Sequence, residues 1–126
     1  MITMLIVDDQ PCVLDAMRQC IALEPDLSII GEAEDGATAL SLARELHPDI
    51  MVTDIKMPHM DGIAMAKALR DTAPDIKVVV LTVHDNKSLK SQAYEAGVAA
   101  YICKHEPAEY ILASIRKVAG EMEVRS

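Results

Sequence analysis

Five short apolar runs alternate with amphipathic stretches along this chain, and this alternation limits the folds that are open to it. The runs cover residues 2–7, 27–33, 50–53, 76–82 and 99–103. Each is too short and too uniformly apolar to be a half-exposed hairpin strand, in which apolar and polar residues would alternate. We therefore expect parallel strands that are buried on both faces by covering helices.

Helical periodicity fills the intervals between these runs. Leu14, Met17 and Ile21 follow the i, i+3, i+7 spacing, and similar stripes recur in the later intervals and in the last segment. The stretch after Asn86 has the weakest apolar stripe, so we expect its helix to be the most loosely held. Because strand and helix alternate throughout, the pattern predicts a three-layer α/β sandwich with right-handed crossovers.

The length of 126 residues suits one domain with one good core. Aromatic residues make up only 2% of the chain, with no Trp or Phe, so the core must be built from Leu, Ile, Val, Ala and the 8 Met. We place the domain at residues 1–119. We expect residues 120–126 to be a C-terminal tail or the start of a linker to an output domain.

Charge and cysteine usage narrow the class of protein further. A net charge of −8 repels phosphate backbones, so we expect no direct nucleic-acid binding by this domain. No apolar run is long enough to cross a membrane, which predicts a cytoplasmic protein. The 3 cysteines, Cys12, Cys20 and Cys103, lack a Cys-x-x-Cys spacing, and we interpret them as small buried hydrophobic residues in a reducing compartment.

Polar side chains follow four of the predicted strands. Asp8 and Asp9 end the first strand, Asp54 follows the third, Thr82 ends the fourth and Lys104 follows the fifth. Because the carboxyl ends of parallel strands meet at one edge of a sheet, these side chains should converge there. Three carboxylates held close together repel one another unless a cation lies among them, and oxygen ligands with open positions favour Mg²⁺.

This cluster suggests phosphoryl chemistry at Asp54. A carboxylate can attack phosphorus and form an aspartyl phosphate, while a metal and Lys104 spread the charge on the phosphoryl oxygens and Thr82 donates a hydrogen bond to one of them. Simpler readings stay open, because adjacent acids are common in turns and Thr82 and Tyr101 are ordinary strand residues.

With these motifs in place, the chain closely resembles the response-regulator receiver domains of two-component signalling. The resemblance rests on "VDD" at 7–9, "DIKMPHMDG" at 54–62, "LT" at 81–82 and "YICK" at 101–104. The ending from residue 95 is most similar to receivers that precede a LuxR-type helix-turn-helix domain. The resemblance implies a flavodoxin-like (βα)5 fold with a five-stranded parallel sheet in the order 2-1-3-4-5.

The resemblance also implies a set of roles at the metal and the phosphoryl group. Asp54 would be the phosphoacceptor, Asp8 and Asp9 would hold Mg²⁺ together with Asp54, and Lys56 would offer a backbone carbonyl to the metal. Lys56 also stands two residues after Asp54, where family members tune dephosphorylation.

Signal output is implied in the same way. Thr82 and Lys104 would contact the phosphoryl group, and Tyr101 would turn inward when Thr82 moves. A sensor histidine kinase would donate the phosphoryl group, and the surface formed by the fourth helix, fifth strand and fifth helix would carry the signal, with a homodimer forming on phosphorylation. The domain would be a signalling switch and not an enzyme, although it assists its own phosphoryl transfer and dephosphorylation. The output would be transcription through a DNA-binding domain, or else the chain would act as a stand-alone receiver in a phosphorelay or a protein-binding switch.

Other classes of protein fit the residues less well. A haloacid-dehalogenase-type phosphatase needs a second acid two residues after the nucleophile, where this chain has Lys56. A flavodoxin-type carrier needs an uncharged phosphate loop after the first strand, where this chain has Asp8 and Asp9. A transition-metal site at His59 and His84 lacks the usual ligand spacing.

Overall fold

Strands and helices alternate through the whole chain. The computed structural model describes residues 1–84 and 86–125. The strands are β1 (Ile2–Val7), β2 (Leu27–Ala33), β3 (Ile50–Thr53), β4 (Lys77–Thr82) and β5 (Ala100–Cys103). The helices are α1 (Pro11–Ala22), α2 (Gly36–Leu46), α3 (Gly62–Thr72), α4 (Lys87–Glu95) and α5 (Ala108–Arg125). The predicted strands are confirmed, and only β4 and β5 begin one residue later than expected.

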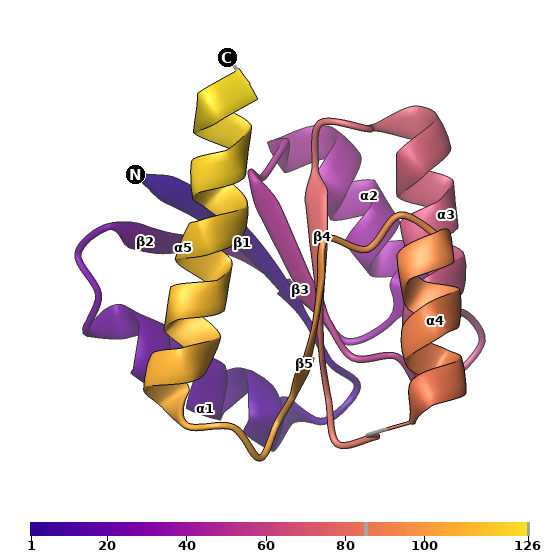
Figure 1. The fold of residues 1–126 in the computed structure, drawn as a ribbon, viewed down its shortest axis with the longest axis horizontal. Coiled ribbons are helices and arrows are strands. Elements are labelled where there is room, and N and C mark those ends of the chain that lie inside the picture. The colour runs from indigo at the N-terminus through magenta and orange to yellow at the C-terminus, as the bar shows by residue number, and fades with distance from the viewer. Residues whose placement is uncertain (85, 126) are drawn as a thin grey trace.

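The five strands form one parallel sheet in the order β2-β1-β3-β4-β5, which confirms the predicted flavodoxin-like topology (Figure 1). Val7 of β1 pairs with Thr53 of β3, which in turn pairs with Val80 of β4. Thr82 pairs with Cys103 at the end of β5. The carboxyl ends of these four strands therefore lie along one edge, where ligand sites of open parallel sheets are found.

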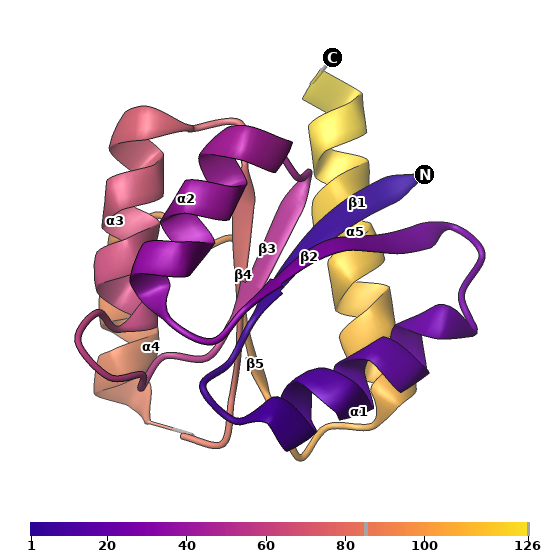
Figure 2. The same cartoon turned by 180° about the vertical axis from the view of Figure 1, so that it is seen from behind.

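Helices cover both faces of the sheet and make three layers (Figures 1 and 2). One face packs against α1 and α5, and the other packs against α2, α3 and α4. Side chains of β1 alternate between the two cores, since Met4 and Ile6 face the first and Leu5 and Val7 face the second. All four are buried, as the uniformly apolar strands predicted.

Helices α3 and α4, which lie beside the carboxyl edge of the sheet, differ in how many of their residues are buried. Five residues of α3 are buried, whereas Ala93 is the one buried residue among the nine of α4, all of which the structure describes. Both helices begin with a side-chain cap: the Asp61 carboxylate accepts from Ala64 N, and the Asn86 side chain accepts from the first backbone N–H groups of α4. The low burial of α4 agrees with the expected weak attachment of the fourth helix, which stays a prediction.

The edge strand β5 has an additional contact with α4. The Tyr94 hydroxyl of α4 accepts a hydrogen bond from the backbone N–H of Tyr101, at 3.3 Å. Tyr94 itself is 46% exposed, so this bond lies at the surface of the domain.

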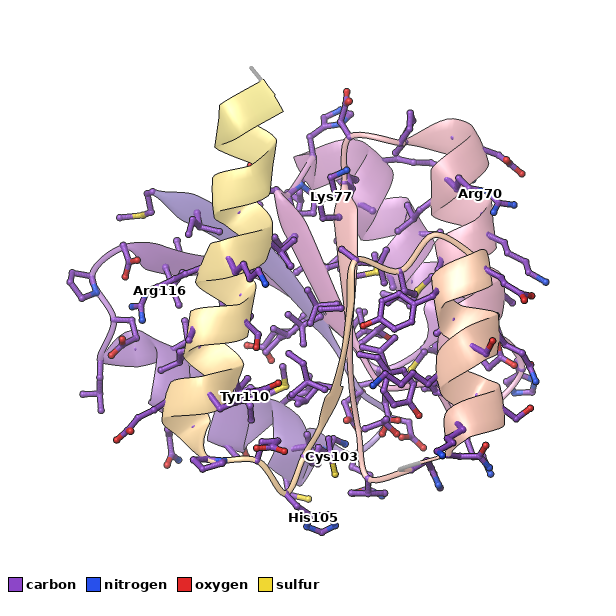
Figure 3. All side chains as sticks on the ribbon, viewed as in Figure 1. Arg70, Lys77, Cys103, His105, Tyr110 and Arg116 are labelled. Atoms are coloured by element: carbon purple, nitrogen blue, oxygen red, sulfur yellow. The ribbon has the colours of Figure 1, made fainter. Side chains whose placement is uncertain are left out.

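Ion pairs join helix α5 to the loop between α1 and β2. Arg116 on α5 reaches the loop between α1 and β2 (Figure 3), where its guanidinium donates to both carboxylate oxygens of Asp26 at 2.8 Å and to Glu24 at 2.7 Å. The hydrogen bond from Arg116 lowers the pKa of Asp26 to about 2. This bidentate pair links two segments that are distant in the sequence.

Helix α5 continues through Arg125, so the residues predicted as a tail or linker begin as an extension of this helix. Ser126 lies outside the described residues, and the domain boundary near residue 119 stays a prediction. Within residues 1–84 and 86–125, no helix has the length and apolar character needed to cross a membrane.

The interpretation of the cysteines as buried residues is wrong. Cys12 is exposed, and Cys20 and Cys103 are partly exposed. Apolar neighbours in the sequence did not imply burial, because consecutive side chains on a helix point in different directions. Cys12 stands in the first turn of α1 and is exposed there.

Candidate functional site

The predicted site residues come together at the carboxyl edge of the sheet. Figure 3 shows this edge at Cys103 and His105, with Lys77 at the opposite edge. Asp8 and Asp54 directly follow β1 and β3, and both are buried, with 2% and 9% of their surface exposed. Lys104 follows β5, and its backbone N–H donates to the carbonyl of Thr82 at 2.8 Å. Residues from four strands therefore meet at one place.

Lys104 joins the two buried carboxylates. Its Nζ atom donates to Asp8 Oδ2 and to Asp54 Oδ2, each at 2.9 Å. Burial lowers the pKa of Lys104, but the hydrogen bonds and charges of Asp8 and Asp54 together outweigh it, so the pKa is raised. The ammonium offsets the repulsion that two neighbouring carboxylates would otherwise suffer away from water.

Asp54 is held by backbone on its other side. Its Oδ1 atom accepts a hydrogen bond from Ile55 N at 2.6 Å, so one oxygen faces the backbone and the other faces Lys104. The Thr53 hydroxyl donates to the Asp54 carbonyl at 2.9 Å, and Gly62 N donates to the Ile55 carbonyl at 2.7 Å. The carboxylate is oriented by the strand end and by the start of α3.

Gly62 allows this arrangement because it has no side chain. A Cβ atom at this position would overlap the carbonyl oxygen of Asp54, which is a backbone atom and cannot rotate away. In the sequence, an Asp-Gly pair such as Asp61-Gly62 indicates only a turn before a helix. The close approach of α3 to the Asp54 backbone was not predictable from that dipeptide.

Thr82 and Tyr101 lie beside the cluster. Thr82 is fully buried at the end of β4, and its hydroxyl accepts a hydrogen bond from His84 N at 3.2 Å. The partly buried ring of Tyr101 packs against the core beneath α2, α3 and α4, and its hydroxyl donates to the carbonyl of His84. Both side chains therefore contact the same short loop after β4.

Asp9 and Lys56 lie at the rim and are exposed. In the described part of the chain, no three acidic, His or Cys side chains are already arranged as a metal site. The donors present are nevertheless carboxylate oxygens, of which those of Asp8 and Asp54 are buried side by side around Lys104. Such hard, incomplete oxygen sets fit Mg²⁺, which keeps several of its waters.

A family comparison identifies the class of protein that this fold and edge define. Residues 4–116 match the family model described as the response regulator receiver domain. The chain belongs to this family, as its motifs predicted.

Individual relatives indicate the branch of the family. The chain is 38% identical over 122 residues to the response regulator GacA of Pseudomonas aeruginosa, covering 96% of this chain and 57% of that protein. It is 32% identical over 121 residues to the nitrate/nitrite response regulator protein NarL of Escherichia coli, covering 95% and 56%. The chain thus spans about half the length of the curated relatives it matches.

Solved structures agree with this placement. A DNA-binding response regulator of the LuxR family from Staphylococcus aureus superposes with a TM-score of 0.88 and 30% identity, covering 94% of this chain and 98% of that chain. The receiver domain of the putative response regulator NarL from Mycobacterium tuberculosis gives a TM-score of 0.90 with 28% identity, covering 94% and 96%. The predicted similarity to receivers of LuxR-type regulators is confirmed.

Proposed function

We propose that this chain is a phosphorylation-dependent receiver in which Asp54 accepts a phosphoryl group from a phosphohistidine. The observation that carries the proposal is the state of Asp54: a buried carboxylate at the active edge, oriented by Ile55 N and paired with Lys104. A carboxylate needed only for solubility would be exposed and free to rotate.

The transfer step conserves atoms and charge. An oxygen of Asp54 forms the new P–O bond while the P–N bond to the donor imidazole breaks, and the imidazole keeps the electron pair and later takes a proton from water. Lys104 exchanges its bond to Asp54 Oδ2 for a bond to a phosphoryl oxygen, so its charge follows the charge that is transferred. The Thr82 hydroxyl donates a hydrogen bond to a second phosphoryl oxygen.

Asp8, Asp9 and Asp54, with the backbone carbonyl of Lys56, would hold Mg²⁺ at this edge. When bound, the ion neutralises charge on the phosphoryl oxygens and on the acids around them. Asp8 supports this role from a buried position, where Gln10 N donates to its Oδ1 atom at 3.0 Å and fixes the carboxylate.

Phosphorylation acts as a switch by shifting populations. The added group brings about two negative charges and new acceptor oxygens to the edge. Thr82 moves toward them, Tyr101 and the loop after β4 follow because they share contacts at His84, and α4 moves because little burial holds it. The surface of α4, β5 and α5 then changes, and homodimer formation follows.

A sensor histidine kinase supplies the phosphoryl group, and the output is transcription through a DNA-binding domain outside residues 1–126. The similarity to regulators such as NarL and GacA supports this arrangement. The acidic surface, with a net charge of −8, leaves contact with nucleic acid to that other domain. The second candidate is a stand-alone receiver that binds a protein partner through the same surface.

Acetyl phosphate, a small phosphoryl donor, tests the acceptor directly. The wild-type chain should gain one base-labile phosphoryl group in millimolar Mg²⁺, and Asp54→Asn should abolish labelling because the amide is not a nucleophile. Removal of the metal with a chelator should also abolish it. Intact-mass spectrometry measures each outcome.

Asp61→Asn is the matched control. It makes the same chemical change at an exposed acid seven positions away, and Asn preserves the helix cap. This variant should label as the wild type does. Labelling that persists in Asp54→Asn would show that the acceptor is a different residue.

A further inference from the structure

A cavity of about 340 Å³ lies between α1, α5 and the face of the sheet that these two helices cover. It lies beside the phosphoacceptor edge and shares Lys104 with it. Its lining comes from all three elements, including Val13, Met17, Val52, Leu81, Ile111 and Leu112. The volume falls within the range of about 300–1,000 Å³ that is typical of small-molecule sites.

The chemistry of the lining selects an uncharged occupant. Among the residues that line the cavity, Lys104 alone carries a charge, and its ammonium already donates to Asp8 and Asp54. A charged ligand would lose its hydration and find no counter-charge here. The mostly apolar lining favours an apolar occupant, as is usual for small-molecule sites.

The form of the cavity favours a small molecule over a protein surface. Val52 and Leu81, which form its floor, are 1% and 7% exposed. The large hydrophobic residues that are well exposed in the described chain, such as Leu23 and Tyr110, do not line it. An aromatic ring or a short alkyl chain is small enough to reach this floor.

The cavity is connected to the phosphoacceptor edge through its lining. The side chain of Lys104 lines the cavity and carries the ammonium that bridges Asp8 and Asp54. Leu81 directly precedes Thr82 in β4. An occupant that packs against these residues restricts the positions open to the Lys104 ammonium.

We propose that this cavity binds one small, uncharged, apolar molecule, of the size of two or three aromatic rings or a short alkyl chain, and that its occupancy changes the rate at which Asp54 is phosphorylated. The first half stands on the cavity alone, and the second half rests on the proposed function. The molecule would be a regulator of the switch and not a substrate.

A fluorescence titration with N-phenyl-1-naphthylamine, an uncharged apolar probe, tests binding. The wild-type chain should bind the probe saturably with one site. Ala16 is exposed on α1 and lines the cavity, so Ala16→Trp should fill it and weaken binding at least about tenfold. Ala108→Trp, which fills the cavity from α5, should act in the same way and serves if Ala16→Trp does not fold.

Ala113→Trp is the control, because Ala113 is an exposed residue of α5 outside the lining. Its affinity for the probe should equal that of the wild type, and thermal melts establish that each variant is folded. Non-saturable fluorescence, or equal binding by the filled and control variants, would overturn the site.

Phosphorylation by acetyl phosphate tests the coupling. Saturating probe should change the initial rate for the wild type and Ala113→Trp by at least about twofold and leave Ala16→Trp unaffected. A bound probe with an unchanged rate would overturn the coupling. If Asp54 takes no label even without the probe, the proposed function fails, while the titration still decides whether the site exists.

Discussion

Helices α3 and α4 stand beside the same edge of the sheet but are held in opposite ways. Helix α3 buries five residues and begins at Gly62, whose backbone lies against the carbonyl of Asp54. Helix α4 buries Ala93, while Leu89 is only partly buried. The first helix is part of the support of the site, and the second contacts the rest of the domain through Ala93, the partly buried Leu89 and Tyr94.

On the proposed function, a small domain has to be rigid at one place and movable at another. The side of the site that orients Asp54 would stay fixed, so that its carboxylate meets phosphorus in one geometry. The side that carries the signal would move at low cost, as elements with little buried apolar surface do. Burial is therefore distributed unevenly around one edge.

The largest effect should come from deleting a buried side chain on the rigid side. Leu69 of α3 is 1% exposed, so Leu69→Ala should lower the free energy of unfolding by about 2–5 kcal/mol. Leu89→Ala in α4 should cost less than about 1 kcal/mol, because its side chain is only partly buried. Urea denaturation measures both, and equal losses would contradict the comparison.

The next largest effect should come from the close backbone contact between Gly62, at the start of α3, and Asp54. Gly62→Ala places a methyl group against the Asp54 carbonyl and should destabilise the domain by about 1–3 kcal/mol while slowing phosphorylation by acetyl phosphate. Gly120→Ala is the matched control in α5, where the added methyl meets open space and better helix propensity should stabilise by up to about 1 kcal/mol. Gly62→Ala with wild-type stability and labelling would remove Gly62 from the support of the site.

The two helix caps separate global from local stability. Asp61→Ala and Asn86→Ala each remove a side-chain cap worth about 1 kcal/mol. Loss of the Asp61 cap should lower global stability, whereas loss of the Asn86 cap should speed hydrogen exchange about fivefold within α4 and leave the denaturation midpoint nearly unchanged. Faster exchange in α3 after Asn86→Ala would mean that the two helices unfold together.

The smallest effect should come from the surface ion pair between Arg116 and Asp26, which involves neither α3 nor α4. Arg116 lowers the pKa of Asp26 to about 2, so this pair stabilises the fold above the ordinary pKa of 3.8 and the contribution is lost as the pH falls toward about 2. The difference in melting temperature between wild type and Asp26→Asn should therefore be constant at neutral pH and vanish between about pH 4 and pH 2. A difference that persists at pH 2 would assign the effect to something other than this charge.

Much of the fold was predictable because burial on both faces leaves a strong mark on a strand. The run at residues 50–53 could not be mistaken for a half-exposed strand, in which polar residues would alternate with apolar ones. The order of strands and helices along the chain then followed from the alternation of the two patterns. Ile76 was predicted as strand but lies before β4, because its N–H closes a turn onto Ala73. Such local hydrogen bonds are not encoded in apolar runs.

The site was predictable in its membership but not in its contacts. Strand ends placed Asp8, Asp54 and Lys104 at one edge, yet their spacing did not reveal that a single ammonium bridges both acids. The cavity beside α1 was equally hidden, because it depends on how two helices pack over the sheet. The exposure of Cys12 was missed for the same reason, since helix rotation and not composition decides it.

The phenol of Tyr94 has a consequence beyond the switch. Strand β5 lies at the end of the sheet, where an unpaired backbone N–H would invite a strand from another molecule and hence aggregation. Tyr94 accepts the N–H of Tyr101, so α4 occupies one backbone donor on this border of the sheet. Displacing α4 would free that donor for a strand of another molecule.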